Sequence, residues 1–404
     1  MKDNQAKYPQ LRFKGFTDPW EKRSLDEITT KTKSYSLSRD VERDHETGYR
    51  YIHYGDIHTG VADIVTEHTN LPNIEPANYD ELRVNDLVVA DASEDYQGIA
   101  EPAVVVGLPT QHLVAGLHTI ALRPSSASSL YLYYLLHTES FKHFGYQTGT
   151  GLKVFGISWS NLSKFTFMIP SRPEQEKIVK LIESVDNLTS DNQRKLAKLK
   201  ELKQGYLQKL FPKNGSKFPQ LRFTGFADAW EERKLGDEVL IVMGQSPNSE
   251  NYTDNPNDHI LVQGNADMKN GHVLPRVWTT QVTKQAEKND LILSVRAPVG
   301  DIGKTAYDVV IGRGVAAIKG NEFIFQNLGK MKSDGYWTRY STGSTFESIN
   351  STDIKEAIIS IPTIEEQQKI GIFFNKLDDN ISLHQLKLEK LQELKKGYLQ
   401  KMFC

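Results

Sequence analysis

The chain carries two pairs of repeated segments, and these constrain its fold more than any other feature. Residues 8–25, YPQLRFKGFTDPWEKRSL, reappear with most positions identical at 218–235 as FPQLRFTGFADAWEERKL; we call these two segments the tags. Residues 169–211 begin IPSRPEQEKI and end ELKQGYLQKLF, and residues 361–403 begin IPTIEEQQKI and end ELKKGYLQKMF. The blocks between them barely resemble each other. The chain is therefore predicted to be a duplicated unit of tag, divergent block and helix.

Length and composition fit a two-domain globular protein. The 404 residues are 38% hydrophobic and 25% charged, and each half is long enough to bury a core. No apolar run approaches the roughly 20 residues that cross a bilayer, and the polar N-terminus MKDNQAKYPQ shows no secretory signal. The one cysteine, Cys404, excludes a disulfide framework and a cysteine-rich zinc site. We therefore expect a cytoplasmic protein.

The net charge of −2 limits the ways in which the chain binds nucleic acid. Proteins that coat nucleic acid nonspecifically tend to be basic. A protein that reads DNA through localised patches remains compatible with this charge.

Residues 171–212 and 363–404 each predict one long helix. Ser171 and Thr363 are followed three residues later by Glu174 and Glu366, the pattern of a capping box in which the glutamate bonds back to the cap. Apolar residues then recur in alternating steps of four and three, as in a coiled coil. The two stripes are Ile178, Ile182, Val185, Thr189, Asn192, Leu196 and Leu199, and Ile370, Phe374, Leu377, Ile381, His384, Leu388 and Leu391.

Asn192 and His384 interrupt the two stripes at equivalent positions. One interpretation is that the edges of the stripes are wet and tolerate polar residues. The other is that the helices pair antiparallel about a pseudo-twofold axis, so that the two residues face each other and set the register.

The divergent blocks, residues 26–168 and 236–360, mix short strands with turns. Residues 84–92 and 118–124 in the first block, and 289–300 and 314–320 in the second, are predicted strands. Residues 131–145 and 321–340 are predicted to be helical. The order of strands, loops and late helix is similar in both blocks, as expected of one scaffold with different recognition loops.

Polar loops in these blocks carry the side chains that read base edges and phosphates. Arg296 or Arg313 suits guanine, and Gln97, Gln245 or Asn248 suits adenine. For any single residue, an ordinary surface turn is the competing interpretation. The candidate DNA-binding residues are Lys33, Ser93, Tyr96, Gln97, Thr148, Lys153, Gln245, Ser246, Asn248, Arg296, Arg313, Ser344 and Thr345.

No catalytic motif is found in the sequence. Gly303-Lys304-Thr305 resembles the end of a phosphate-binding loop, but Pro298 stands where that motif needs glycine. His53 and His58 have spacing that suits a metal, yet a structural role fits them better, and no metal site is expected. Nucleophile elbows and zinc-protease motifs are missing as well.

Taken together, the tags, the PEQEKI and EEQQKI helix starts, the GYLQKLF and GYLQKMF helix ends, and the segments SVRAPVGDIG and GVAAIKG resemble the specificity subunit (HsdS) of type I restriction-modification systems. The resemblance runs from residue 8 to the C-terminus. In addition, VVADASEDYQGIAEPAVVV and GLHTIALRP resemble one subtype of the family's target recognition domain.

The resemblance implies an α+β fold. Two structurally similar globular α/β target recognition domains would be separated by two long antiparallel, coiled-coil-like helices with pseudo-twofold symmetry. The implied boundaries are 1–170 for the first recognition domain, 171–212 for the first spacer helix, 213–362 for the second recognition domain and 363–404 for the second spacer helix.

The resemblance also implies a noncatalytic subunit that reads a bipartite, gapped double-stranded DNA target, one half-site per recognition domain. Two adenine methyltransferase subunits would dock on the tags and helices, and two motor-nuclease subunits would complete the complex. S-adenosylmethionine, ATP and Mg are expected on those partners, and this chain is expected to bind no cofactor and no membrane.

Two other functions remain open on the residues alone. The chain would be an interaction scaffold, duplicated for symmetry, that never touches bases; or it would be a fused nuclease or methyltransferase with a divergent site. The difference between the two blocks favours a reader of two different half-sites, because a scaffold for identical partners has reason to keep both blocks alike.

Overall fold

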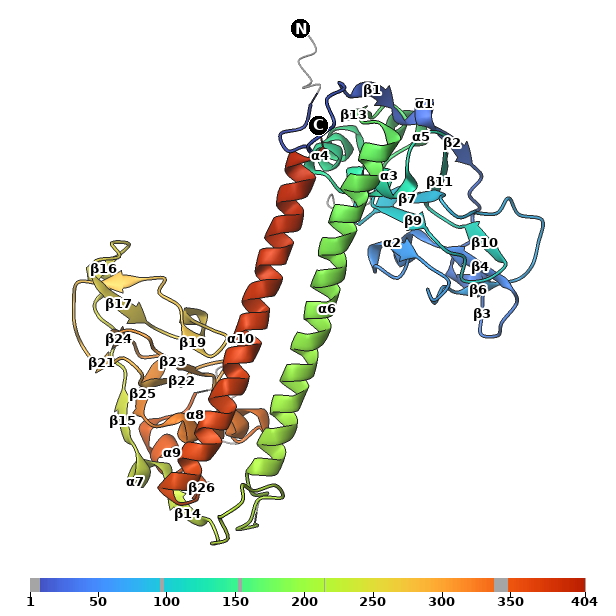
Figure 1. Cartoon of the computed structure of the whole chain (residues 1–404). Helices are drawn as coiled ribbons and strands as arrows, with labels where there is room; N and C mark the ends of the chain where they lie inside the picture. The colour runs from blue at the N-terminus through green and yellow to red at the C-terminus, as the bar shows by residue number, and fades with distance from the viewer. Residues whose placement is uncertain (1–7, 95–97, 152–154, 214, 338–347, 404) are drawn as a thin grey trace. The chain divides into compact units, whose positions relative to one another are not determined.

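The chain forms two compact units in a computed structural model that describes residues 8–94, 98–151, 155–213, 215–337 and 348–403. The first unit comprises Met1–Asp191 and Leu388–Cys404, and the second comprises Asn192–Lys387. Two long helices, α6 (Arg172–Leu210) and α10 (Ile364–Lys401), each begin in one unit and end in the other (Figure 1). Each unit thus contains one globular domain and a segment of both long helices.

The globular domain of the first unit contains two main sheets. The larger has the strand order β2-β11-β7-β9-β5, in which only β5 and β9 run parallel. The smaller has the order β10-β4-β6-β3, in which β10 and β4 run parallel. The strands are β2 (Thr29–Thr32), β3 (Glu42–Arg43), β4 (Tyr49–Ile52), β5 (Ile64–Val65), β6 (Asn73–Ile74), β7 (Leu87–Ala90), β9 (Pro102–Val105), β10 (His112–Ala115) and β11 (Thr119–Pro124).

Two short strand pairs and several helices complete this unit. The pairs are β1 (Glu21–Ser24) with β13 (Thr166–Ile169), and β8 (Ala92–Ser93) with β12 (Phe155–Gly156). The helices are α1 (Leu25–Ile28), α2 (Tyr54–His58), α3 (Ser129–Leu135), α4 (Glu139–Thr148) and α5 (Trp159–Leu162), with a 3₁₀ turn at Arg39–Val41.

The second unit repeats this topology with different residues. Its larger sheet has the order β15-β25-β22-β23-β19-β18, with β19 parallel to β23 as β5 is to β9. Its smaller sheet has the order β16-β20-β17-β24-β21, with β17 parallel to β24 as β4 is to β10. The strands are β15 (Leu240–Met243), β16 (Tyr252–Thr253), β17 (His259–Val262), β18 (Met268–Lys269), β19 (His272–Val273), β20 (Trp278–Thr279), β21 (Gln285–Ala286), β22 (Leu291–Ser294), β23 (Ile302–Lys304), β24 (Val309–Ile311) and β25 (Val315–Lys319).

The remaining elements of the second unit also have counterparts in the first. Strand β14 (Glu231–Lys234) pairs with β26 (Ile358–Ile361) as β1 pairs with β13. The helices are α7 (Leu235–Glu238), α8 (Glu322–Ser333) and α9 (Ser351–Lys355), with 3₁₀ turns at Ser249–Asn251 and Asn265–Asp267. The shared topology of the two globular domains, together with the long helices, confirms the predicted fold class.

The strands predicted from the sequence are found as β7, β11, β22 and β25. The segment 131–145, predicted as one helix, lies in two helices, α3 and α4. The break has a local cause: the hydroxyl of Thr138 accepts a hydrogen bond from the backbone N–H of Phe141 and so caps α4. In the second unit, α8 ends at Ser333, before the end of the predicted segment.

Segments of α6 and α10 run antiparallel within each unit. In the first unit, Ile178 of α6 shares a core with Phe403, which follows α10, while Asp186 pairs with Lys395 at 2.6 Å. In the second unit, the ring of Phe211, which follows α6, lies 6.2 Å from that of Phe374. The predicted stripes are largely buried, with Ile182 and Phe374 fully so, because the seam of a helix pair excludes water.

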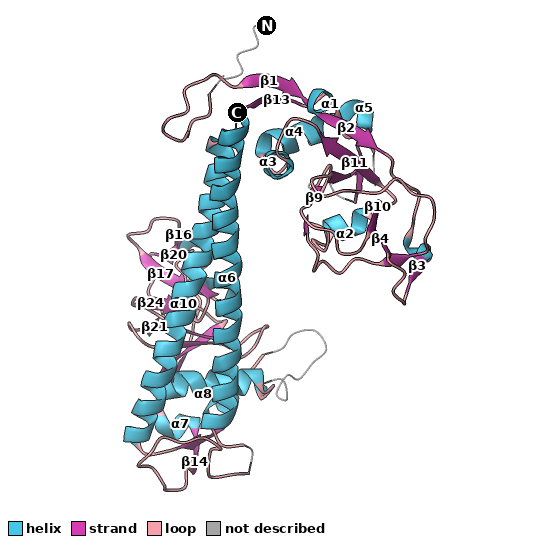
Figure 2. Ribbon diagram, turned by 45° about the vertical axis from the view of Figure 1, so that its right-hand side comes forward, coloured by secondary structure: helices cyan, strands magenta, loops and turns pink. Residues whose placement is uncertain are grey.

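The tags fasten the start of one long helix to the end of the other within each unit. In the first unit, Arg12 binds both carboxylate oxygens of Glu174, at 2.7 and 2.8 Å, and the backbone N–H of Leu11 donates to the carbonyl of Lys401. Figure 2 shows the β1–β13 pair close to the C-terminal end of α10. Each tag therefore connects the two long helices within its own unit.

The second tag makes the same contacts in its own unit. Arg222 binds both oxygens of Glu366 at 2.8 Å, and Leu221 N–H donates to the carbonyl of Lys209. Glu174 and Glu366 were expected to bond back to the helix caps; their carboxylates instead accept from these arginines. The arginines are 162 and 144 residues away from the glutamates in the chain, so no local sequence pattern predicts these two ion pairs.

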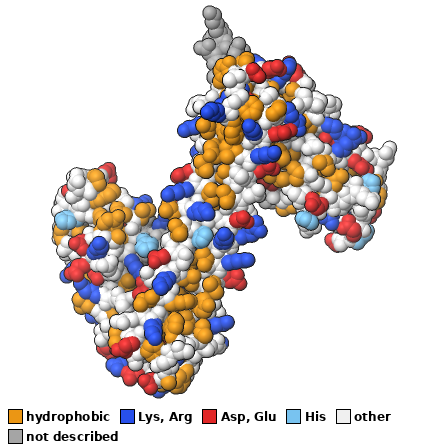
Figure 3. All heavy atoms as spheres, viewed as in Figure 1, with side chains coloured by type: hydrophobic (Ala, Val, Ile, Leu, Met, Phe, Trp, Pro, Cys, Tyr) orange, Lys and Arg blue, Asp and Glu red, His pale blue; other side chains and the backbone are white. Residues whose placement is uncertain are grey.

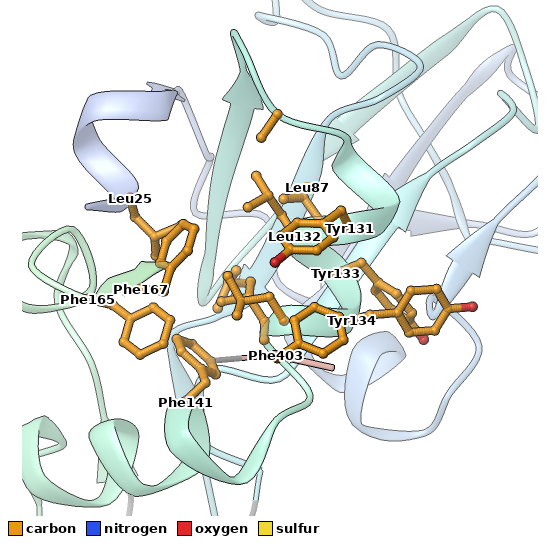
Figure 4. Packing of buried hydrophobic residues seen from close by; sticks show 14 of the residues in the cluster. Leu25, Leu87, Tyr131, Leu132, Tyr133, Tyr134, Phe141, Phe165, Phe167 and Phe403 are labelled. Carbon is orange, nitrogen blue, oxygen red and sulfur yellow. The ribbon is translucent and has the colours of Figure 1, made fainter. Parts of the chain in front are cut away.

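Aromatic residues at the ends of the long helices complete the two cores. In the first unit, Phe403 stacks on Tyr131 of α3 with ring centroids 5.0 Å apart (Figure 4). In the second unit, Phe211 stacks on Phe323 of α8 at 5.2 Å. These contacts explain why both helix ends carry the same aromatic residue after GYLQK: each fills the core beneath the first helix that follows the large sheet.

Candidate nucleic-acid interface

The ends of β15 and β22 lie on either side of the start of β25, and this arrangement brings three predicted residues together. The registers Met243↔Ala316 and Ser294↔Val315 align β15 and β22 on either side of β25. Bonds from Gly244 N to Val315 O and from Val295 N to Gly314 O continue both ladders. When the registers are continued past the strand ends, Ser246 and Arg296 lie opposite Arg313 on its two sides. We call these three residues the second-unit cluster.

The second-unit cluster is polar and held through its backbone, with two exposed arginines and a half-buried serine. Ser246 Oγ accepts a hydrogen bond from Arg313 N at 3.1 Å, and Arg296 bridges to Ser348 through its backbone. Both arginine side chains are exposed, and neither is ion-paired to an acidic residue in the part of the chain that the structure describes. Exposed guanidinium groups on a fixed backbone are suited to phosphates and to guanine edges.

Glycines allow the backbone of this cluster to approach the neighbouring strand closely. A Cβ atom on Gly314 would lie 2.0 Å from the carbonyl oxygen of Gln263, and one on Gly244 would lie 2.1 Å from that of Gly312. These contacts explain why residues 314 and 244 are glycine. They also bring Gln263 to the edge of the cluster. The sequence did not single out Gln263, because the residue directly follows a strand that carries no recognisable motif.

The equivalent end of the first unit contains a hollow of about 720 Å³. We call it the first-unit hollow; its lining includes Arg39, His53, Tyr54, His58, Ser93 and Lys142. Ser93 was predicted from the sequence, whereas the other five residues were not selected as DNA-binding candidates. His58 lies between Glu101 Oε2, at 2.9 Å, and the carbonyl of Ala92, at 2.8 Å.

His53 and Gln263 occupy corresponding positions in the two units. Each follows the strand of the smaller sheet that has a parallel neighbour, β4 or β17. The backbone N–H of His53 donates to Asp56 at 2.9 Å, and that of Gln263 donates to Asp267 at 2.8 Å. The same scaffold position therefore carries an imidazole in one unit and an amide in the other.

The surroundings of the His53 imidazole favour its neutral form. Burial lowers the pKa of His53, and the positive charge of Arg39 lowers it further. Its Nδ1 accepts from Gly55 N–H at 3.1 Å, so the single proton of the neutral ring lies on Nε2. From the sequence, His53 and His58 were interpreted as structural. Only the three-dimensional structure shows that they line the same hollow as Ser93.

The other predicted DNA-binding residues are dispersed. Lys33 lies with its Nζ 4.8 Å from the centroid of the Tyr35 ring and lines a different hollow, with Arg83 and Arg123. The Thr148 hydroxyl donates to the carbonyl of Phe144 inside α4. Gln245 and Asn248 are exposed in the loop after β15. Tyr96, Gln97, Lys153, Ser344 and Thr345 lie outside the described residues.

Asn192 and His384 meet within the second unit. Asn192 Nδ2 donates to the carbonyl of His384 at 2.7 Å, and Asn192 Oδ1 lies 2.6 Å from His384 Nδ1. The side chain of Asn192 is only 2% exposed, which does not fit a wet edge of the stripe. Their role in setting the register stays a prediction.

On the face shown in Figure 3, acidic and basic side chains are interspersed. Among the described residues, no group of three or more His, Cys, Asp or Glu side chains is arranged to hold a metal ion. None of the described helices combines the length and apolar character needed to span a membrane.

Comparison with known proteins identifies similar chains. The family model described as the type I restriction modification DNA specificity domain matches residues 17–204 and again 227–393. The proposed type I restriction enzyme MjaX specificity subunit of Methanocaldococcus jannaschii is 28% identical over 399 residues, which cover 94% of this chain and 91% of that protein.

Solved structures share the fold. The crystal structure of a type I restriction-modification system S subunit from M. genitalium matches with a TM-score of 0.66 at 16% identity, over 98% of this chain and 99% of that one. A chain from a study of complex assembly and conformational transition of the type I restriction-modification system matches with a TM-score of 0.57 at 20% identity, over 95% and 97% of the two chains.

Proposed function

Since the chain belongs to the family of type I restriction-modification DNA specificity domains, we propose that it reads a bipartite, gapped DNA target, one half-site with each unit. One observation carries the proposal: two domains of the same topology present different side chains at the same strand ends. The strand ends carry Tyr54 beside the buried His53 in the first unit, and Gln263, Arg296 and Arg313 in the second. Different hydrogen-bonding groups on one scaffold select different base edges.

In this proposal the chain is the noncatalytic recognition subunit, and the chemistry belongs to partners. Two methyltransferase subunits, binding S-adenosylmethionine, methylate adenine in each half-site, and two motor-nuclease subunits use ATP and Mg. The near-neutral charge of this chain supports such a division, because the partners then supply much of the nonspecific attraction to phosphates.

Equivalent apolar residues remain exposed in both tags, which supports docking of the same partner at each. Leu11 is 41% exposed and Leu221 is 42% exposed, and the ring residues Tyr8 and Phe218 are about equally open to solvent. Exposed apolar groups at matching positions fit two copies of one partner surface.

Methylation sequencing of DNA from cells that express this chain with its methyltransferase tests the proposed function. The expected result is methylated adenine in a motif of two short parts separated by a fixed number of unspecified bases. Methylation of an ungapped motif, or methylation that persists without this chain, would contradict the proposal. A scaffold that never contacts bases would not determine which sequence is methylated, so the dependence of the motif on this chain separates the two functions.

Replacing Arg313 by alanine should weaken recognition at one or two positions of a single half-site. A bidentate arginine–guanine contact contributes about 1–3 kcal/mol of discrimination. The measurement is binding of the methyltransferase complex to targets with single base changes. Lys319→Ala, which removes an exposed cation at the other end of β25, is the matched control and should leave base preference unchanged. An equal loss for every target would identify Arg313 as a phosphate contact instead.

A further inference from the structure

Asp378 joins three helices in the second unit. It lies on α10 and accepts a hydrogen bond from the Nζ of Lys203 on α6, with Nζ 2.6 Å from Oδ1 and 2.9 Å from Oδ2. Its Oδ2 also accepts from Nε2 of Gln326 on α8, at 2.7 Å. Gln326 is 2% exposed, so a buried amide of the globular domain is bonded directly to the long-helix pair.

Asp186 makes the same connection in the first unit. It lies on α6, and its Oδ1 is 2.6 Å from Nζ of Lys395 on α10. Its Oδ2 accepts from the hydroxyl of Tyr134 on α3 at 3.0 Å. Burial raises the pKa of Tyr134, so the phenol keeps its proton and remains a donor at neutral pH. The ring of Tyr134 is 1% exposed.

The two aspartates occupy the same place in the repeat. Asp186 and Asp378 follow the first residues of α6 and α10, Arg172 and Ile364, by the same 14 positions. The donor from the globular domain differs, a phenol in the first unit and an amide in the second. The connection is thus common to both units, although the domains that it holds have diverged.

A second attachment point lies near the start of each long helix. In the first unit, the Ser128 N–H at the beginning of α3 donates to Oε1 of Gln175 at 2.9 Å. In the second unit, Asn321 Nδ2 at the beginning of α8 donates to Oε1 of Gln367 at 2.9 Å. Gln175 and Gln367 each also donate to a proline carbonyl in front of their helix. The two separated polar attachments add directional restraint to the non-directional apolar contacts of the shared core, and together they oppose rotation of the domain on its helix.

We propose that Asp186 and Asp378 are positioning residues that hold each recognition domain at a fixed angle on its helices, so that spacer length is read to a single base pair. The inference rests on the proposed function. Adding one base pair moves a half-site by about 3.4 Å along the DNA and turns it by about 35°. A domain held by the aspartate, in addition to Gln175 or Gln367 and the shared core, resists that turn more than a domain that lacks the aspartate bond.

Tyr134→Phe is the sharpest test because it removes one hydrogen bond and keeps the ring. Tyr133→Phe is its matched control: Tyr133 is the adjacent buried residue of α3, but its hydroxyl bonds to Asp63 inside the globular domain. The measurement is binding and methylation by the complex with its methyltransferase on targets whose spacer is native, one base pair longer or one shorter.

Tyr134→Phe should reduce the preference for the native spacer by about tenfold, the factor expected from one hydrogen bond to a charged group, with both half-site sequences unchanged. Tyr133→Phe should keep the wild-type preference. Gln326→Leu should repeat the effect from the second unit, independently of whether Tyr134→Phe folds.

Two outcomes overturn the inference while the proposed function stands. One is a wild-type preference in both Tyr134→Phe and Gln326→Leu; the other is an equal relaxation in Tyr133→Phe, which would indicate a merely structural effect. A wild-type complex that methylates no gapped motif overturns the proposed function and this inference together.

Discussion

Exchanging residues 239–350 for the corresponding block of a relative with a different target, with Asn321 and Gln326 kept, should change one part of the methylated DNA motif and leave the other part and the spacer unchanged. The reason is physical separation of function: the second-unit cluster lies wholly inside this block, and the first-unit hollow lies wholly outside it. Methylation sequencing reads both parts of the motif in one experiment.

The structure also indicates where the exchange should be cut. Strand β14 pairs with β26, and α7 contacts α9, so the segments 231–238 and 351–361 form one packed base. A Cβ atom on Gly236 would lie 2.9 Å from the Lys355 side chain, so a foreign α7 with a side chain at this position would not fit the native α9. Cuts at 239 and 350 keep this base native.

The reciprocal exchange is the control. Replacing residues 29–158, which lie between α1 and α5, with Tyr134 kept, should change the other part of the motif alone. An exchange of either block that alters both parts would show that the units do not read independently, and the one-unit, one-half-site proposal would be wrong.

Replacing Glu366 by alanine should destabilise the second unit by about 3 kcal/mol, at the lower end of the range for removing one partner of a buried ion pair. The Glu366 side chain is 1% exposed and that of Arg222 is 15% exposed. The variant leaves Arg222 largely desolvated with neither of its two carboxylate bonds. Thermal and denaturant unfolding of the complex with its methyltransferase measures the loss.

Two control variants show whether the loss of stability comes from the unpaired charge of Arg222 or from mutation in general. Glu231→Ala removes a surface carboxylate from an exposed pair with Arg233 and should change stability by less than about 1 kcal/mol. The double variant Arg222→Met with Glu366→Met removes both charges and should recover most of the loss. A double variant as unstable as Glu366→Ala would show that packing, not an unpaired charge, sets the cost.

Much of the fold was predictable because it depends on local spacing. The stripes that include Ile182 and Phe374 predict long helices with one buried face, and those residues are fully buried. The strands β7 and β22 are continuous apolar runs, which predict buried strands. Such patterns are readable because burial repeats every few residues along one element.

The candidate interface was less predictable because its residues come from separate strands. Ser246, Arg313 and Arg296 each fall in a plausible loop, but only the registers of β15, β25 and β22 place them at one level. His53 was interpreted as structural from the sequence, although its spacing to His58 suits a metal. Its correspondence to Gln263 depends on the parallel strand pairs of the smaller sheets.

The sequence by itself determined that this protein is a duplicated unit with two long helices and two divergent domains, because repeats and periodicity are properties of the linear order. Tertiary structure alone decided which distant groups meet: Arg12 with Glu174, Tyr134 with Asp186, and Ser246 with Arg313. The physical reason is that a hydrogen bond or an ion pair depends on atoms being a few ångströms apart in space, and separation along the chain carries no record of that distance.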